Sequence, residues 1–233
     1  MNSFTTLCAK ETAALFRSPI AYAVIAVFLL LMGYTFTATL FLNKTAGLIP
    51  VFMQASVLML LMVPVITMRL LAEERRGGTL ELLLTSPVRE IEVVLAKFLS
   101  SMAVIAAMLA LTLAYPMALQ YFGDPDWGPV YSGYLGMLLL GGALASLGLA
   151  ISALTANQIV AAVASLGLFV LLWMLDMLGS LLPAPYDDIV TDMSLRVHII
   201  PFATGSLYLS DLGYFATLIL LGLLLSVRAL ARR

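Results

Sequence analysis

Six apolar runs, each long enough to cross a lipid bilayer, divide the sequence. They cover about residues 20–42, 48–68, 98–122, 130–154, 159–182 and 212–227. At ~1.5 Å per helical residue, a run of ~20 residues matches a hydrocarbon core ~30 Å thick. The sixth run is short unless its helix starts earlier. The pattern predicts an all-α integral membrane protein, with six transmembrane helices in a single domain over residues 1–233.

Prolines and small residues mark special positions within these runs. Pro64 in the second run and Pro116 in the third each remove a backbone hydrogen bond, so both helices are expected to kink. In the fourth run small residues recur every four positions, at Gly142, Ser146 and Ala150 and again at Gly141 and Ala145. This spacing either lets another helix approach closely or reflects the frequency of small residues in membrane helices.

The segments outside the runs are less apolar. Residues 2–17 are mildly amphipathic and predict a helix lying along the membrane surface. A signal peptide is the alternative, but the next apolar run is too long and lacks a convincing cleavage site. Pro183 and Pro185 end the fifth helix. Residues 197–208 are apolar enough to lie in the interface or to re-enter the membrane.

The composition and the distribution of charge narrow the class further. Hydrophobic residues make up 62% of the chain and charged residues 11%, which excludes a soluble domain. The net charge of −1 argues against nucleic-acid binding. Cys8 is the only cysteine, so no intrachain disulfide can form. Ten of the twelve Lys and Arg residues lie in the N-terminal segment, residues 69–97 and the C-terminal tail, which predicts that these parts are cytoplasmic.

A few polar residues are candidates for chemistry. Asp187, Asp188 and Asp192 are reminiscent of acidic Mg²⁺-binding runs, but no second acidic cluster accompanies them, so a solvated loop is favoured. Asp176 lies inside the fifth run, close enough to its outer end to reach water or headgroups; a functional role is the alternative. His198 is the only histidine and is interpreted as an interfacial side chain.

Residues 69–97 form the one densely charged stretch, with five basic and five acidic side chains between two spans. Gly77 and Gly78 break the incoming helix, Thr79 can cap a short new helix, and Pro87 limits its length. One side of that helix carries Leu80, Leu83 and Leu84. So short a helix is stable only when docked. Its balanced charge favours a protein partner, while lipid stays the alternative.

The residues of this stretch resemble a known family. The sequence EERRGGTLELLLTSPV (73–88) resembles the signature of ABC transporter permeases of the type-2 exporter superfamily, in the gliding-motility-like branch. FRSPIAYAVIAVFLLLMGY (16–34) and RVHIIPFATGSLYLSDLGYF (196–215) resemble other parts of the same permeases. The resemblance implies a coupling helix at 78–87 that contacts a separate ATPase. It places ATPase-coupling residues at Glu73, Glu74, Arg75, Gly78, Thr79, Leu80, Glu81, Leu83, Leu84, Thr85 and Pro87.

The implied function is transport without catalysis by this chain. The sequence has no G-x-x-x-x-G-K-[ST] loop, so ATP and Mg²⁺ would be bound by the partner ATPase and no cofactor is expected here. The resemblance also implies a second permease chain, identical or related. The prediction is therefore an ABC permease of the bacterial inner membrane that works as an exporter. An integral-membrane enzyme or an assembly subunit without a transport cycle is the alternative, and the sequence does not identify the substrate.

Overall fold

A computed structural model describes residues 3–43, 48–78, 89–122, 126–184 and 186–231. Nearly all of these residues are helical and none is in a strand. Six helical spans are long and apolar enough to cross a membrane, which confirms the predicted all-α membrane fold. They are α2 (Pro19–Asn43), α3 (Ile49–Thr67), α6 (Glu90–Thr112) with α7 (Ala114–Phe122), α8 (Trp127–Leu154), α9 (Gln158–Gly179) and α12 (Leu209–Ala231).

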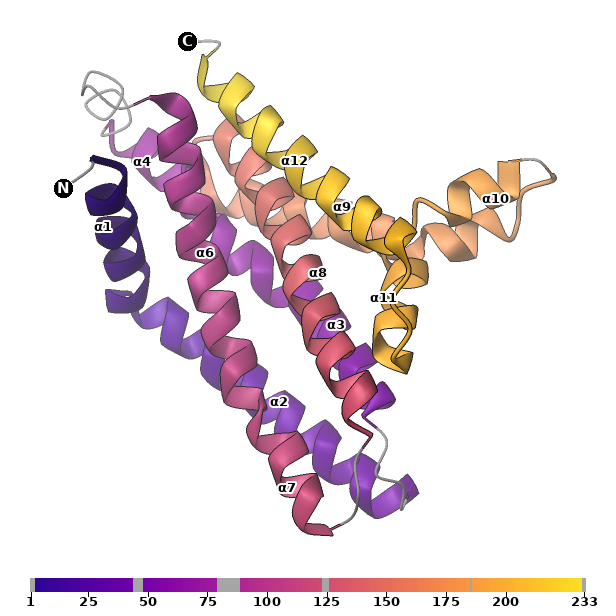
Figure 1. Cartoon of the computed structure of the whole chain (residues 1–233). Helices are drawn as coiled ribbons and strands as arrows, with labels where there is room; N and C mark the ends of the chain where they lie inside the picture. Colours follow the sequence, from indigo (N-terminus) through magenta and orange to yellow (C-terminus); the bar gives the residue numbers. More distant parts are fainter. Residues whose placement is uncertain (1–2, 44–47, 79–88, 123–125, 185, 232–233) are drawn as a thin grey trace.

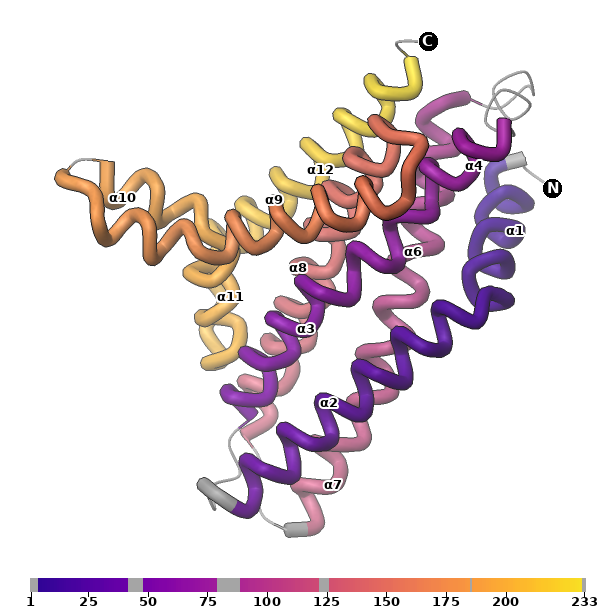
Figure 2. Tube along the Cα trace, turned by 180° about the vertical axis from the view of Figure 1, so that it is seen from behind, coloured from indigo at the N-terminus to yellow at the C-terminus, as the bar shows by residue number. Residues whose placement is uncertain are grey.

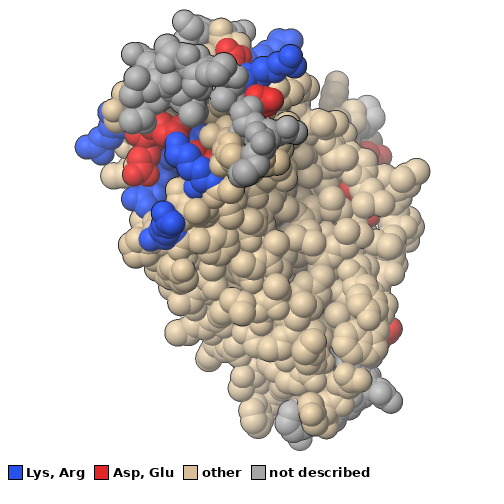
Figure 3. Space-filling view, turned by 60° about the vertical axis from the view of Figure 1, so that its left-hand side comes forward, with Lys and Arg blue, Asp and Glu red and all other residues tan. Residues whose placement is uncertain are grey.

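Four shorter helices complete the described fold. They are α1 (Ser3–Arg17), which matches the predicted amphipathic segment, α4 (Ala72–Arg76), α10 (Tyr186–Thr191) and α11 (Leu195–Thr204). The chain ends, α1 and α4 gather at one end of the bundle, whereas α7 and the end of α2 lie at the other (Figures 1 and 2). Lys and Arg side chains cluster at the first of these ends, together with Glu, while the rest of the face seen in Figure 3 is almost free of charge. We call this end the basic end.

The central helix of the bundle is α8. It packs against α3, α6, α9, α11 and α12, and 78% of its most apolar window is buried. The corresponding share is only 17% in α2, 17% in α9 and 22% in α12. The outer helices therefore present large apolar faces to lipid or to another chain.

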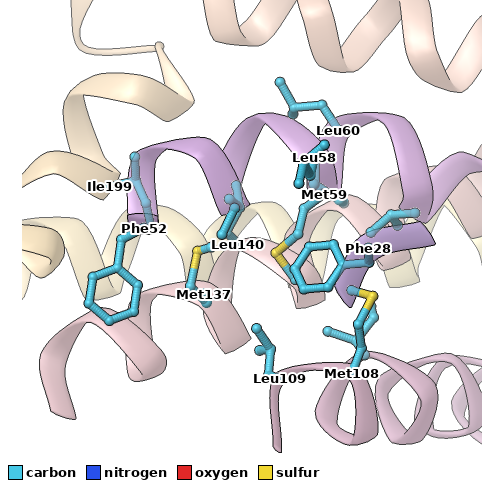
Figure 4. Packing of buried hydrophobic residues seen from close by; sticks show 14 of the residues in the cluster. Phe28, Phe52, Leu58, Met59, Leu60, Met108, Leu109, Met137, Leu140 and Ile199 are labelled. Carbon is cyan, nitrogen blue, oxygen red and sulfur yellow. The ribbon is translucent and has the colours of Figure 1, made fainter. Parts of the chain in front are cut away.

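Side chains from several helices interlock around α8. Phe28 of α2, Met59 of α3, Met108 of α6 and Leu140 of α8 are fully buried in one cluster (Figure 4). Ile199 of α11 joins the same cluster at 2% exposure. The segment after the fifth span thus folds back onto the bundle.

The small residues of α8 allow close helix packing. A Cβ atom added at Gly222 of α12 would lie 2.5 Å from Ser146 Oγ, and one at Gly141 would lie 2.8 Å from Ile105 of α6. Neither distance is compatible with an unshifted side chain. The spacing therefore serves close approach between helices of this chain, and mere frequency of small residues does not account for it.

Helix boundaries differ from the apolar runs where capping rather than hydropathy decides them. The third span begins at Glu90, eight residues before the predicted start at Phe98, and the backbone N–H of Arg89 donates to Glu92 Oε2 at 3.0 Å. The start of the helix is set by its capping residue and not by the first apolar residue. Charged side chains are tolerated there because this part of the helix is at the membrane surface. The fifth span ends earlier, at Gly179, and the sixth runs longer, from Leu209 to Ala231.

The two prolines act differently. The third span is interrupted at Leu113, three residues before Pro116, whose missing N–H cannot bond to the Thr112 carbonyl. In contrast, α3 continues past Pro64 as a single helix, and the next turn is retained because Met68 N donates to Pro64 O at 2.9 Å.

Candidate functional site

The predicted coupling residues fall into two groups. Glu73, Glu74, Arg75 and Gly78 lie in the part of the chain that the structure describes. Outside the described residues lie Thr79, Leu80, Glu81, Leu83, Leu84, Thr85 and Pro87. The structure therefore shows how the central charged segment is attached to the bundle on its two sides.

The first attachment is α4, which ends at the predicted glycine break. Gly77 N donates to Glu73 O at 2.9 Å, and Gly78 has φ = +69°. An L side chain rarely adopts this left-handed conformation. A Cβ atom at Gly78 would meet nothing within 4 Å, so the backbone angle and not space is what demands glycine.

Hydrogen bonds hold helix α4 against the end of α8. Ser152 Oγ accepts hydrogen bonds from the backbone N–H groups of Leu71 (3.2 Å) and Ala72 (3.0 Å), and donates to Met68 O (3.2 Å). It thus replaces the N-cap side chain that Leu71 cannot supply. Arg75 Nη1 donates to Ala153 O at 2.7 Å. Sequence reasoning missed Ser152, because its partners lie about 80 residues away.

A buried cation joins α4 to two further helices. Lys97 of α6 is 1% exposed, and its Nζ lies 2.9 Å from Glu11 Oε2 of α1 and 2.7 Å from Glu74 Oε1 of α4. An ammonium group can be buried in this way only when it is paired and hydrogen-bonded. The sequence marked Lys97 only as one charge of the segment, and Glu11 was not singled out at all.

A second ion pair borders the same region. Arg69 donates to Ser18 Oγ at 2.9 Å, and its Nε lies 3.3 Å from Glu73 Oε2. A cleft of about 280 Å³ lies between these groups and the Lys97 cluster, lined by side chains of α1, the α3–α4 connection, α4 and α6. The base of the charged segment is therefore a polar joint in which α1, α3, α4, α6 and α8 meet.

The acidic residues beyond the fifth span are arranged differently from the prediction. Asp187 and Asp188 lie in the first turn of helix α10, so this part of the predicted solvated loop is helical. The Asp176 carboxylate forms an ion pair: its Oδ2 lies 2.7 Å from Arg196 Nη1, and its side chain is 16% exposed. Among the described residues, no group of three or more His, Cys, Asp or Glu side chains is arranged to hold a metal ion.

His198 is likewise more than an interfacial side chain. Its Nδ1 lies 2.7 Å from Asp211 Oδ1, its Nε2 lies 2.8 Å from Asp192 O, and its ring stacks on Tyr214 at 3.9 Å. This cluster ties α11 to the first turn of α12. No sequence signal indicates this cluster, because a lone histidine and a lone aspartate 13 residues apart form no motif.

Comparison with known proteins supports the reading from the residues. The family model described as "ABC-2 family transporter protein" matches residues 44–211, which is well over half of the chain. The match includes the charged segment, α4, the Lys97 side of the joint and α8. A search of curated proteins found no match. With six apolar spans and this match, the chain belongs to the ABC-2 transporter family and is a multi-pass transmembrane permease subunit of an ABC transporter.

Proposed function

We propose that this permease belongs to an ATP-driven exporter of the gliding-motility-like branch, and that residues 73–89 couple it to a separate ABC ATPase. Two ATPase subunits would close on ATP and Mg²⁺, and two permease chains would then alternate between inward-open and outward-open states. The second permease chain is identical or related. In this assembly the present chain supplies the pathway and binds no nucleotide.

The observation that carries the proposal is the joint around Lys97. Glu74 precedes residues 79–88 and Lys97 follows them, and the two side chains form one buried ion pair. Ser152 and Arg75 fasten the same α4 to the end of α8. A displacement of the segment by a bound partner would therefore act on α1, α4, α6 and α8 together. A coupling element needs this property.

The distribution of charge supports the orientation. Apart from Arg196, the described Lys and Arg residues lie in the elements of the basic end. In a bacterial inner membrane such an excess marks the cytoplasmic side. Both termini and the coupling segment would then face the cytoplasm, where an ATPase has access to ATP.

The proposal is tested with a charge placed on the leucine face of the segment. Leu83→Asp would bring a carboxylate into an apolar contact, at a cost of roughly 1–3 kcal/mol or more. The matched control is Leu82→Asp, because at ~100° per residue position 82 would be on the other side of the helix that the sequence predicts. ATPase subunits that co-purify with the wild type are identified by mass spectrometry, and ATP hydrolysis by the complex is measured.

We expect Leu83→Asp to lose most of the ATPase, while Leu82→Asp retains it and both variants reach the membrane normally. Equal ATPase recovery and equal hydrolysis in the two variants would refute coupling through this face. If no ATPase co-purifies with the wild type, the proposed coupling of residues 73–89 to a separate ATPase is refuted.

A further inference from the structure

A second cleft lies at the basic end, away from the joint around Lys97. It has a volume of about 270 Å³ and lies between α8, α9 and α12. Both α9 and α12 pack on α8 but make little contact with each other, so the two helices diverge and leave this space. The walls are chiefly Leu147, Ile151 and Leu154 of α8, Leu168 of α9 and Leu225 of α12.

The cleft is open to the surroundings of the bundle. Leu154 is 71% exposed and Leu225 is 50% exposed, and both belong to helices whose outer faces are apolar. In a membrane, an exposed apolar rim of this kind is suited to contact with lipid. The volume is near the lower limit of small-molecule pockets, ~300–1,000 Å³, so it suits part of a larger flexible molecule better than a whole compact one.

Among the residues that the structure describes, one charged side chain lines the cleft. Arg228 lies in the last turn of α12, where the span ends, and it is exposed. No described acidic side chain is within ion-pair distance of it. The aspartates of the flanking spans, Asp176 of α9 and Asp211 of α12, lie near the opposite ends of their helices.

An apolar cleft with a single cation at headgroup level has the chemistry of an anionic glycerophospholipid site. We propose that this cleft binds such a lipid from the leaflet at the basic end, with the phosphate on Arg228 and an acyl chain along the leucines of α8 and α12. Basic pockets between spanning helices bind anionic headgroups in this way. A free phosphate ion would leave the apolar walls uncovered, so the lipid is the better complement.

The test uses the purified full chain without any ATPase, so its result is independent of the proposed coupling. Retention of phosphatidylglycerol and of phosphatidylcholine with the same acyl chains is measured by native mass spectrometry. Arg228→Gln removes the cation. Arg17→Gln is the matched control, because Arg17 is also exposed, in the last turn of a helix and at the basic end. Ala229→Trp fills the cleft from α12.

We expect the wild type to retain phosphatidylglycerol over phosphatidylcholine. Arg228→Gln should lower that retention roughly fivefold, the equivalent of ~1 kcal/mol for one basic residue at an anionic surface. Arg17→Gln should leave the retention of phosphatidylglycerol unchanged. Ala229→Trp should lower retention of both lipids, and the Arg228→Gln comparison stands alone if that variant does not fold.

Three results would overturn the proposal. The first is equal retention by Arg228→Gln and Arg17→Gln. The second is a rise in melting temperature with inorganic phosphate alone that matches the rise with phosphatidylglycerol, which would assign the site to the free ion. The third is a weaker self-association of Ala229→Trp with unchanged lipid retention, which would mean that a second copy of the chain covers the cleft.

Discussion

Lys97 Nζ lies 2.7 Å from Glu74 Oε1, and this contact closes the base of the charged segment. The two residues are 23 positions apart and lie on either side of residues 79–88. Lys97 also pairs with Glu11 of α1. Both ends of the segment are therefore anchored at the same buried ion-pair cluster. A base closed in this way is what the proposed coupling role requires, because a movement of the segment would be passed to α1, α4 and α6.

The first prediction concerns this base. Lys97→Met would leave the carboxylates of Glu11 and Glu74 close together without their cation, and breaking a buried ion pair costs roughly 3–5 kcal/mol. We expect a clearly lower melting temperature and weaker ATPase stimulation. Lys97→Arg should recover part of both. The control is Arg89→Met, which removes an exposed cation at the start of the same helix; if it melts at the same temperature as Lys97→Met, the joint is not important for stability.

The second prediction concerns the packing of α8 against α12. In Gly222→Ala the new Cβ would lie 2.5 Å from Ser146 Oγ and 2.6 Å from its carbonyl carbon, so the helices must separate. Overpacking of this kind costs roughly 1–3 kcal/mol. At Gly213 of the same helix a Cβ meets nothing within 4 Å, so Gly213→Ala should be neutral or stabilising by up to ~1 kcal/mol. The measurement is the melting temperature of each variant relative to the wild type. Equal melting temperatures of the two variants would contradict the close packing.

The third prediction concerns topology. Burial, and secondly the Glu11 carboxylate, raise the pKa of the Cys8 thiol. A raised pKa means less thiolate at neutral pH, so Cys8 should react slowly with maleimides, and more readily as the pH is raised. The Cys8→Ser background removes it altogether.

In that background, Asp188→Cys should react with an impermeant maleimide added to intact cells, whereas Gly77→Cys should react only after the membrane is permeabilised. Gly77 is suitable because it is exposed and has an ordinary φ of −82°, unlike Gly78. Labelling of Gly77→Cys from outside would reverse the proposed orientation and remove the coupling segment from the cytoplasm.

The fourth prediction concerns His198 and Asp211. His198→Phe keeps a ring to stack on Tyr214 but loses both hydrogen bonds, and the Asp211 carboxylate, in a residue only 6% exposed, loses its partner. Leaving a buried carboxylate without its partner should cost roughly 1–3 kcal/mol. Adding Asp211→Asn should restore part of the loss, because a neutral amide is less costly to bury. Strictly additive changes in melting free energy in the double-mutant cycle would show that the two side chains do not interact.

The sequence by itself determined the features that are carried by contiguous residues. The apolar runs placed all six spans because the bilayer requires ~20 apolar residues in a row. The glycine pair placed the end of α4, since Gly78 supplies the left-handed angle. The stretch from Glu73 to Val88 indicated the family that the comparison then showed. The coupling helix itself stays a prediction from the sequence.

Only the tertiary structure decided which polar side chains meet. Lys97 finds Glu11 at a separation of 86 residues, and Ser152 caps α4 at a separation of 80. His198 pairs with Asp211 because α11 folds back against the bundle. Hydropathy reports whether a residue can be buried, but an ion pair or a cap depends on which helix faces are packed together. That choice is made by shape, here by the small residues of α8 that let α12 and α6 approach closely. Their spacing indicates close packing, but it does not say which helix packs there.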